Sequence, residues 1–122
     1  MILKHIAFPV RDLDSSVEFY VKFFGFKTVG KWERDGISAI QLKDENDFML
    51  ELTFSPKAKL FSIERPETQH LGFVVEDLKT NIEYFKQEDV KIIQEIRPGI
   101  TVKRFAFISD PNGLPIELVE LK

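Results

Sequence analysis

The chain has 122 residues, 43% of them apolar, and a formal net charge of −3; this suits one compact domain and offers no basic stripe to a nucleic-acid partner. It contains no cysteine, so disulfides, thiolate metal ligands and a cysteine nucleophile are excluded. No stretch approaches the roughly 18 apolar residues of a membrane span, so we expect a cytoplasmic protein that acts on a small molecule without binding a membrane.

The first half of the chain predicts the order strand, helix and three further strands. Residues 2–10 alternate in polarity as a strand does, and Gly25 ends the helical spacing that follows Asp12. Ser15 and Glu18 have the spacing of a capping box at the start of that helix. The further strands are expected near residues 26–33, 36–43 and 47–54.

The second half predicts the same order. A strand near 68–75 is followed by a helical pattern from Leu78 to Phe85, in which Thr80 and Glu83 repeat the capping-box spacing. Further strands are expected near residues 90–97, 103–109 and 115–121. The stretch 55–67 between the halves is predicted to be a connector, with a possible role in a substrate lid.

The two halves are copies of one unit. His5-Ile-Ala-Phe recurs as His70-Leu-Gly-Phe, and Leu-Glu51-Leu recurs as Ile-Glu117-Leu, so that both histidines of the chain occupy the same position of the repeat. Internal duplication is a strong guide to architecture. We therefore predict an α+β fold of two tandem βαβββ modules, with curved mixed sheets that form a cup and helices outside it. The modules are expected near 1–54 and 68–122, within a single domain that spans residues 1–122.

Strand periodicity places the repeated histidines and glutamates on one face of the sheets. His5, Glu51, His70 and Glu117 share one parity, opposite to apolar residues that a helix should cover. Two imidazoles and two carboxylates that are related by the repeat can bind a divalent metal ion. The alternative is a polar network of His and Glu without metal, and each of these residues taken singly is typical of a solvent-facing position.

The motifs that carry these residues resemble those of the vicinal oxygen chelate superfamily, over essentially the whole chain. That superfamily includes glyoxalase I, methylmalonyl-CoA epimerase, extradiol dioxygenases and the bleomycin and fosfomycin resistance proteins. The motifs are Lys-His5-Ile-Ala-Phe, Leu-Glu51-Leu-Thr, Gln-His70-Leu-Gly-Phe and Asp-Pro-Asn-Gly-Leu-Pro-Ile-Glu117-Leu. The order His, Glu, His, Glu is most like glyoxalase I, the lactoylglutathione lyase.

The resemblance implies a metal-dependent lyase for methylglyoxal detoxification. Its substrate would be the thiol hemithioacetal of an α-oxoaldehyde, and the reaction a proton transfer through a metal-bound enediolate. His5, Glu51, His70 and Glu117 would bind one divalent metal per site, with nickel or cobalt favoured and zinc or manganese also fitting. Glu117 would be the primary base, and Glu51 a ligand and second acid/base. A homodimer with its sites between modules is expected, because each half leaves a sheet edge to be paired.

The sequence departs from glyoxalase I where that enzyme recognises glutathione. Pro9 stands in place of an arginine on the first strand, and Ser55 in place of an asparagine after the second ligand motif. An anion handle from Arg11, or from Lys103 and Arg104, is possible, although a solvated basic pair is more typical of the last two. Two other functions stay open: a drug- or metabolite-binding protein of the bleomycin-resistance type, and another enzyme of the superfamily, such as an epimerase or a resistance transferase.

Overall fold

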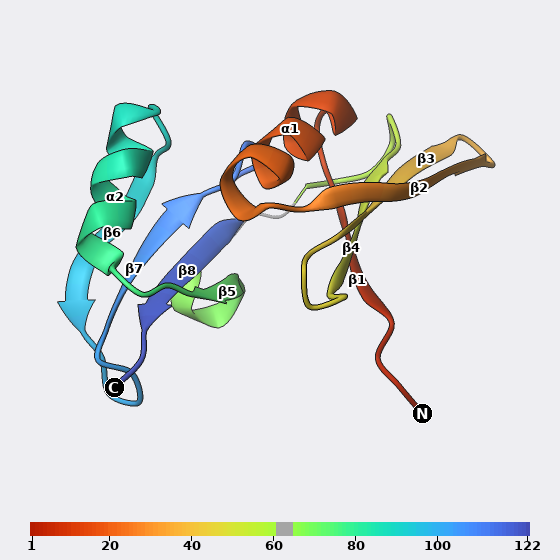
Figure 1. Cartoon of the computed structure of the whole chain (residues 1–122). Helices are drawn as coiled ribbons and strands as arrows, with labels where there is room; N and C mark the ends of the chain where they lie inside the picture. Colours follow the sequence, from red (N-terminus) through yellow and green to blue (C-terminus); the bar gives the residue numbers. More distant parts are fainter. Residues whose placement is uncertain (61–64) are drawn as a thin grey trace. The chain divides into compact units, whose positions relative to one another are not determined.

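The computed structural model describes residues 1–60 and 65–122, and the chain divides into two compact units, Met1–Phe61 and Ser62–Lys122. Each unit contains a helix and a four-stranded mixed sheet in the order βαβββ (Figure 1). The predicted α+β class and its two βαβββ modules are confirmed. Assembly into a single domain stays a prediction, and residues 61–64 of the expected connector and lid lie outside the described residues.

The first unit builds its sheet around its last strand. Its elements are β1 (His5–Pro9), α1 (Leu13–Phe24), β2 (Lys27–Arg34), β3 (Ile37–Lys43) and β4 (Met49–Phe54). The strand order is β1-β4-β3-β2, in which β1 is parallel to β4 and the other pairs are antiparallel. Helix α1 contacts β3 and β4, so it covers one face of this sheet (Figure 1).

The second unit has the same topology after a short 3-10 turn. Its elements are η1 (Pro66–Thr68), β5 (Leu71–Val74), α2 (Leu78–Gln87), β6 (Ile92–Pro98), β7 (Arg104–Ser109) and β8 (Pro115–Glu120). The strand order is β5-β8-β7-β6, with β5 parallel to β8. Helix α2 contacts β6, β7 and β8. No helix among the described residues is long and apolar enough to cross a membrane.

Both helices begin at an aspartate, and the predicted capping boxes are wrong. Asp12 is the N-cap of α1 and accepts a hydrogen bond from the Ser15 N–H at 2.8 Å. Asp77 does the same for α2, where it accepts from the Thr80 N–H at 3.1 Å. Aspartate and serine are both good N-caps, so a run that contains several of them does not identify the first residue of a helix.

The apolar face of each sheet packs under its helix, as the strand parity predicts. In the first unit Leu50 and Leu52 are fully buried, and the Phe8 ring lies edge-on to Tyr20 of α1 with their centroids 6.2 Å apart. In the second unit Ile116 and Leu118 are fully buried with the inward residues of α2. The opposite face of each sheet carries the repeated histidine and glutamate.

Gly25 ends α1 in a backbone conformation that suits glycine. Its φ is 70°, and its N–H donates to the carbonyl of Tyr20. Because an added Cβ would meet no atom within 4 Å, Gly25→Ala tests conformation alone, and we expect unfolding to be easier by about 1–2 kcal/mol. Urea denaturation measures this change. Gly72→Ala, at a glycine without positive φ, should leave stability unchanged, and an equal loss in both variants would contradict the assignment.

Candidate metal centre

The first histidine–glutamate pair lies on the neighbouring strands β1 and β4. Ala7 is the register partner of Glu51, and His5, two residues before Ala7, therefore points to the same face. His5 Nε2 is 3.9 Å from Glu51 Oε1. The Glu51 side chain is 10% exposed and that of His5 33%, so the pair sits at the surface of the face that α1 leaves uncovered.

Two side-chain donors hold the other oxygen of Glu51. Gln41 Nε2 donates to Glu51 Oε2 at 2.8 Å, and Trp32 Nε1 donates to the same atom at 3.2 Å. Gln41 stands directly across from Glu51 on β3. These hydrogen bonds, that of Gln41 above all, lower the pKa of Glu51, although burial acts in the opposite direction. Glu51 is therefore an ionised carboxylate whose Oε1 faces His5.

The second pair is closer and is organised from the histidine. His70 Nε2 is 3.2 Å from Glu117 Oε2, and His70 Nδ1 is 2.7 Å from the carbonyl oxygen of Pro66. Since a carbonyl only accepts, Nδ1 carries the hydrogen of this contact. Nε2 is left facing the Glu117 carboxyl group, where a shared proton or a metal ion can lie between the two atoms.

Phe107 gives the second pair surroundings different from those of the first. It stands across from Glu117 on β7, the position that Gln41 has relative to Glu51, and its ring lies edge-on to His70 with centroids 5.2 Å apart. Within the described part of the chain Glu117 receives no side-chain hydrogen bonds like those on Glu51. Glu117 is thus the less restrained carboxylate of the two.

The nitrogen and the oxygen of each pair are close enough to bind one divalent ion. A nitrogen and an oxygen that bind one ion at about 2.0–2.2 Å can lie no more than about 4.3 Å apart, and both pairs meet this limit. The His70 bond to a backbone carbonyl is the outer contact that metal-binding histidines commonly make. Among residues 1–60 and 65–122 no three His, Asp or Glu side chains form one such group, and the four-residue site stays a prediction.

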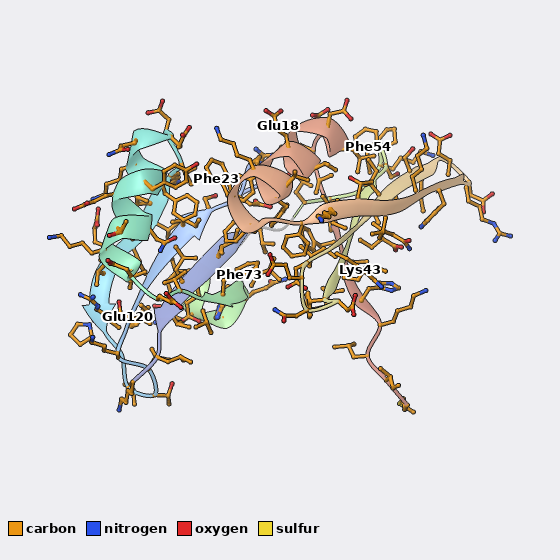
Figure 2. All side chains as sticks on the ribbon, viewed as in Figure 1. Glu18, Phe23, Lys43, Phe54, Phe73 and Glu120 are labelled. Atoms are coloured by element: carbon orange, nitrogen blue, oxygen red, sulfur yellow. The ribbon has the colours of Figure 1, made fainter. Side chains whose placement is uncertain are left out.

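Of the basic residues that the sequence suggested as contacts for an anion, Lys103 and Arg104 pair with a carboxylate of their own unit. Glu120, labelled in Figure 2, is the last residue of β8. Lys103 Nζ and Arg104 Nη2 each lie 2.9 Å from its carboxylate, which also accepts from the Leu78 N–H at the start of α2. They are thus ion-paired with Glu120, while the Lys103 side chain stays 59% exposed, as a solvated basic residue would be. Arg11 follows the end of β1 at Pro9, so strand parity does not place its side chain.

Sequence reasoning missed three residues that share the faces of the pairs. Trp32 and Gln41 contact Glu51 directly, but they belong to strands whose register the sequence does not reveal. Arg97 stands across from Phe105, which is on the same face of the second sheet as Phe107 and Glu117. Strand register therefore places Arg97 on the face of the second pair.

Comparisons with known proteins match nearly the whole chain. A family model described as Glyoxalase/Bleomycin resistance protein/Dioxygenase superfamily matches residues 2–118. The uncharacterized protein YaeR of Escherichia coli (strain K12) is 31% identical over 95% of this chain and 93% of its own. A probable chloroplastic lactoylglutathione lyase of Arabidopsis thaliana is 28% identical over 95% of this chain and 35% of its own. The solved structure of the trypanothione-dependent glyoxalase I of Leishmania major is 29% identical, with a TM-score of 0.80 over 98% of this chain and 86% of that one.

Proposed function

The chain belongs to the Glyoxalase/Bleomycin resistance protein/Dioxygenase superfamily, and on that premise we propose that it is a metal-dependent lyase of the glyoxalase I type. Its substrate would be the hemithioacetal of a thiol and an α-oxoaldehyde. The observation that carries the proposal is the recurrence of one His–Glu pair at the same position of both modules. Relatives named lactoylglutathione lyase support it.

His5, Glu51, His70 and Glu117 would hold the ion. Two neutral imidazoles and two carboxylates balance a divalent charge, with nickel or cobalt favoured over zinc or manganese. A bound ion would supply Lewis-acid polarisation of the substrate oxygens. The hydrogen bonds on Glu51 Oε2 and on His70 Nδ1 fix one ligand of each pair before the ion arrives, which supports metal binding.

Glu117 is the better candidate for the base that takes a proton from the carbon next to the carbonyl. A general base must be free to approach the proton, and Glu117 has no side-chain donors like Gln41 and Trp32 within the described residues. The hydrogen bonds from Gln41 and Trp32 lower the pKa of Glu51, which suits a ligand that stays ionised. We assign Glu51 the role of ligand and second acid/base.

The thiol of the substrate is not assigned to glutathione, because Pro9 and Ser55 replace residues that recognise it in glyoxalase I. Arg97, on the face of Glu117, is the proposed contact for a negatively charged group of the substrate. We further propose a cytoplasmic homodimer, since β1 and β5 are edge strands of their sheets and leave backbone groups to be paired.

Metal content tests the proposal most directly. After loading with nickel, cobalt, manganese or zinc, the wild-type protein should hold about one ion per chain, or one per two chains, by elemental analysis. His5→Ala and Glu117→Ala should each lose the ion, because each removes one ligand of a pair. Glu45→Ala, which removes an exposed carboxylate of the β3–β4 loop, should keep it.

Two outcomes would redirect the assignment. If no metal is held in stoichiometric amount under any loading, the four residues form a polar network, and the drug- or metabolite-binding alternative takes first place. If metal is held but no hemithioacetal is turned over, acyl-CoA esters and drug substrates test the epimerase and resistance-transferase alternatives.

A further inference from the structure

Three residues of the first unit together determine how Glu51 is held. Gln41 and Trp32 both donate to Glu51 Oε2, at 2.8 and 3.2 Å, and the carboxylate is largely buried beside them. Strand β3 lies between β4 and β2, so Gln41 has Glu51 as its register partner on one side and Gly30 on the other. The Nε2 end of its amide donates to Glu51, and the Oε1 end lies against Gly30. A Cβ at Gly30 would lie 2.8 Å from Gln41 Oε1, so a side chain at that position is incompatible with the observed amide.

Gly30 is not required by its own backbone conformation. The glycines with positive φ are Gly25, Gly36 and Gly113, and Gly30 is not one of them. Its register partner is Gln41, just after a register shift that follows Thr28. Close approach of the Gln41 amide is therefore the physical reason for glycine at this position.

The second unit has no such arrangement, so it is not a general requirement of the module. Phe107 occupies the place of Gln41 and donates no hydrogen bond, while the restraint falls on His70 through Pro66. In the first unit the restraint is reversed: Glu51 is held, and His5 Nδ1 is buried with no hydrogen-bond partner among the described residues. Each pair thus has one residue held by hydrogen bonds: the glutamate in the first unit and the histidine in the second.

We propose that Gln41 and Trp32 are positioning residues that hold Oε2 of Glu51 and leave Oε1 for the metal ion, and that Gly30 provides the space for Gln41. This inference rests on the proposed function and adds the residues that set the affinity of the site. Two donors on one oxygen fix the rotation of the carboxylate before the ion binds. Outer contacts of this kind typically contribute about 10–100-fold to metal affinity.

Gly30→Ala separates this role from a structural one. Only the far end of a flexible side chain has to move to accept the new methyl group, so the fold is not strained. The amide of Gln41 must nevertheless shift, and we expect this shift to weaken its hydrogen bond to Glu51. The variant alters neither the donor, the acceptor nor any proposed metal ligand.

The experiment measures nickel affinity by competition with a chelator for the full chain and four variants. Gly30→Ala, Gln41→Leu and Trp32→Phe should each weaken Ni²⁺ binding by about 10–100-fold. Glu45→Ala, at an exposed residue of the β3–β4 loop, is the control and should leave the affinity unchanged.

A spectroscopic readout accompanies the affinities. Trp32 is the single tryptophan of the chain and contacts Glu51, so its emission reports on this carboxylate. Addition of Ni²⁺ to the wild-type protein should change the tryptophan emission over the concentration range in which the competition assay shows that nickel binds. In Gly30→Ala and Gln41→Leu the midpoint should move to higher nickel concentration.

Each result has one meaning. Wild-type affinity in Gly30→Ala and Gln41→Leu would overturn the inference and leave the proposed function intact. If the variants bind nickel more weakly and their metal-free forms are also thermally less stable to a matching degree, these residues serve the fold, and the inference is overturned. Failure of the wild-type protein to bind nickel, cobalt, manganese or zinc would overturn both the inference and the proposed function.

Discussion

Replacing Glu117 with glutamine is expected to lower the turnover of a hemithioacetal by about 10²–10⁴-fold, because a positioned general base contributes roughly this factor. The amide keeps the size of the side chain and one oxygen that can bind a metal ion. It cannot accept the substrate proton at neutral pH. Metal content should therefore fall far less than turnover, and both are measured on the same nickel-loaded preparation.

Glu51→Gln is the matched comparison. Its carbonyl oxygen can still accept from Gln41 and Trp32, which leaves the NH₂ group directed toward His5, where a ligand oxygen is needed. Metal and activity should thus be lost together in this variant. Full activity in Glu117→Gln would refute the base assignment, and equal loss of metal in the two variants would make Glu117 chiefly a ligand.

Glu120 is expected to make stability depend on pH in the acid range. Hydrogen bonds from Lys103, Arg104 and the Leu78 N–H lower its pKa from the ordinary value of 4.5 to about 2 in the folded protein. A carboxylate with a depressed folded-state pKa contributes its full stabilisation above the unfolded-state pKa. This contribution is present above about pH 4.5 and is lost as the pH falls toward 2.

The measurement is the thermal midpoint of wild type and Glu120→Gln between pH 2 and pH 7. Glutamine leaves Lys103 and Arg104 without their carboxylate, so the variant should be less stable at neutral pH. The two midpoints should converge as the pH approaches 2. The pKa values of Asp12 and Asp77 are also lowered, so only the difference between the curves reports on Glu120. Parallel curves would show that Glu120 does not titrate in this range.

The duplicated sequence made the fold and the two His–Glu pairs predictable. Each helix and strand could be predicted twice, once from each copy of the pattern. His5 shares a strand face with Glu51, and His70 with Glu117, and this prediction does not depend on the exact residues at which the strands end. The contacts across strands were not predictable in the same way. A register shift of one residue moves a side chain to the other face, and β2 has such an irregularity between Thr28 and Gly30.

The pairing of charged residues was also beyond the sequence. Lys103 and Arg104 look like a basic surface pair, yet β7 and β8 place Arg104 directly across from Glu120. The start of α2 then adds the Leu78 N–H to the same carboxylate. Each of these partners is remote in the chain, and their meeting depends on the register of strands and on where a helix begins.

The strand topology has a consequence for how the chain folds during synthesis. Among the described residues every strand pairs within its own unit, and the sheet of the first unit is complete at Phe54. This sheet can therefore form while the second half is still being translated. The duplication also creates a risk of incorrect strand pairing. Strand β1 pairs in parallel with β4, and β5 with β8, and β4 and β8 have similar sequences. Pairing of β1 with β8 of another molecule would exchange strands between chains, so early closure of the first sheet protects against misassembly.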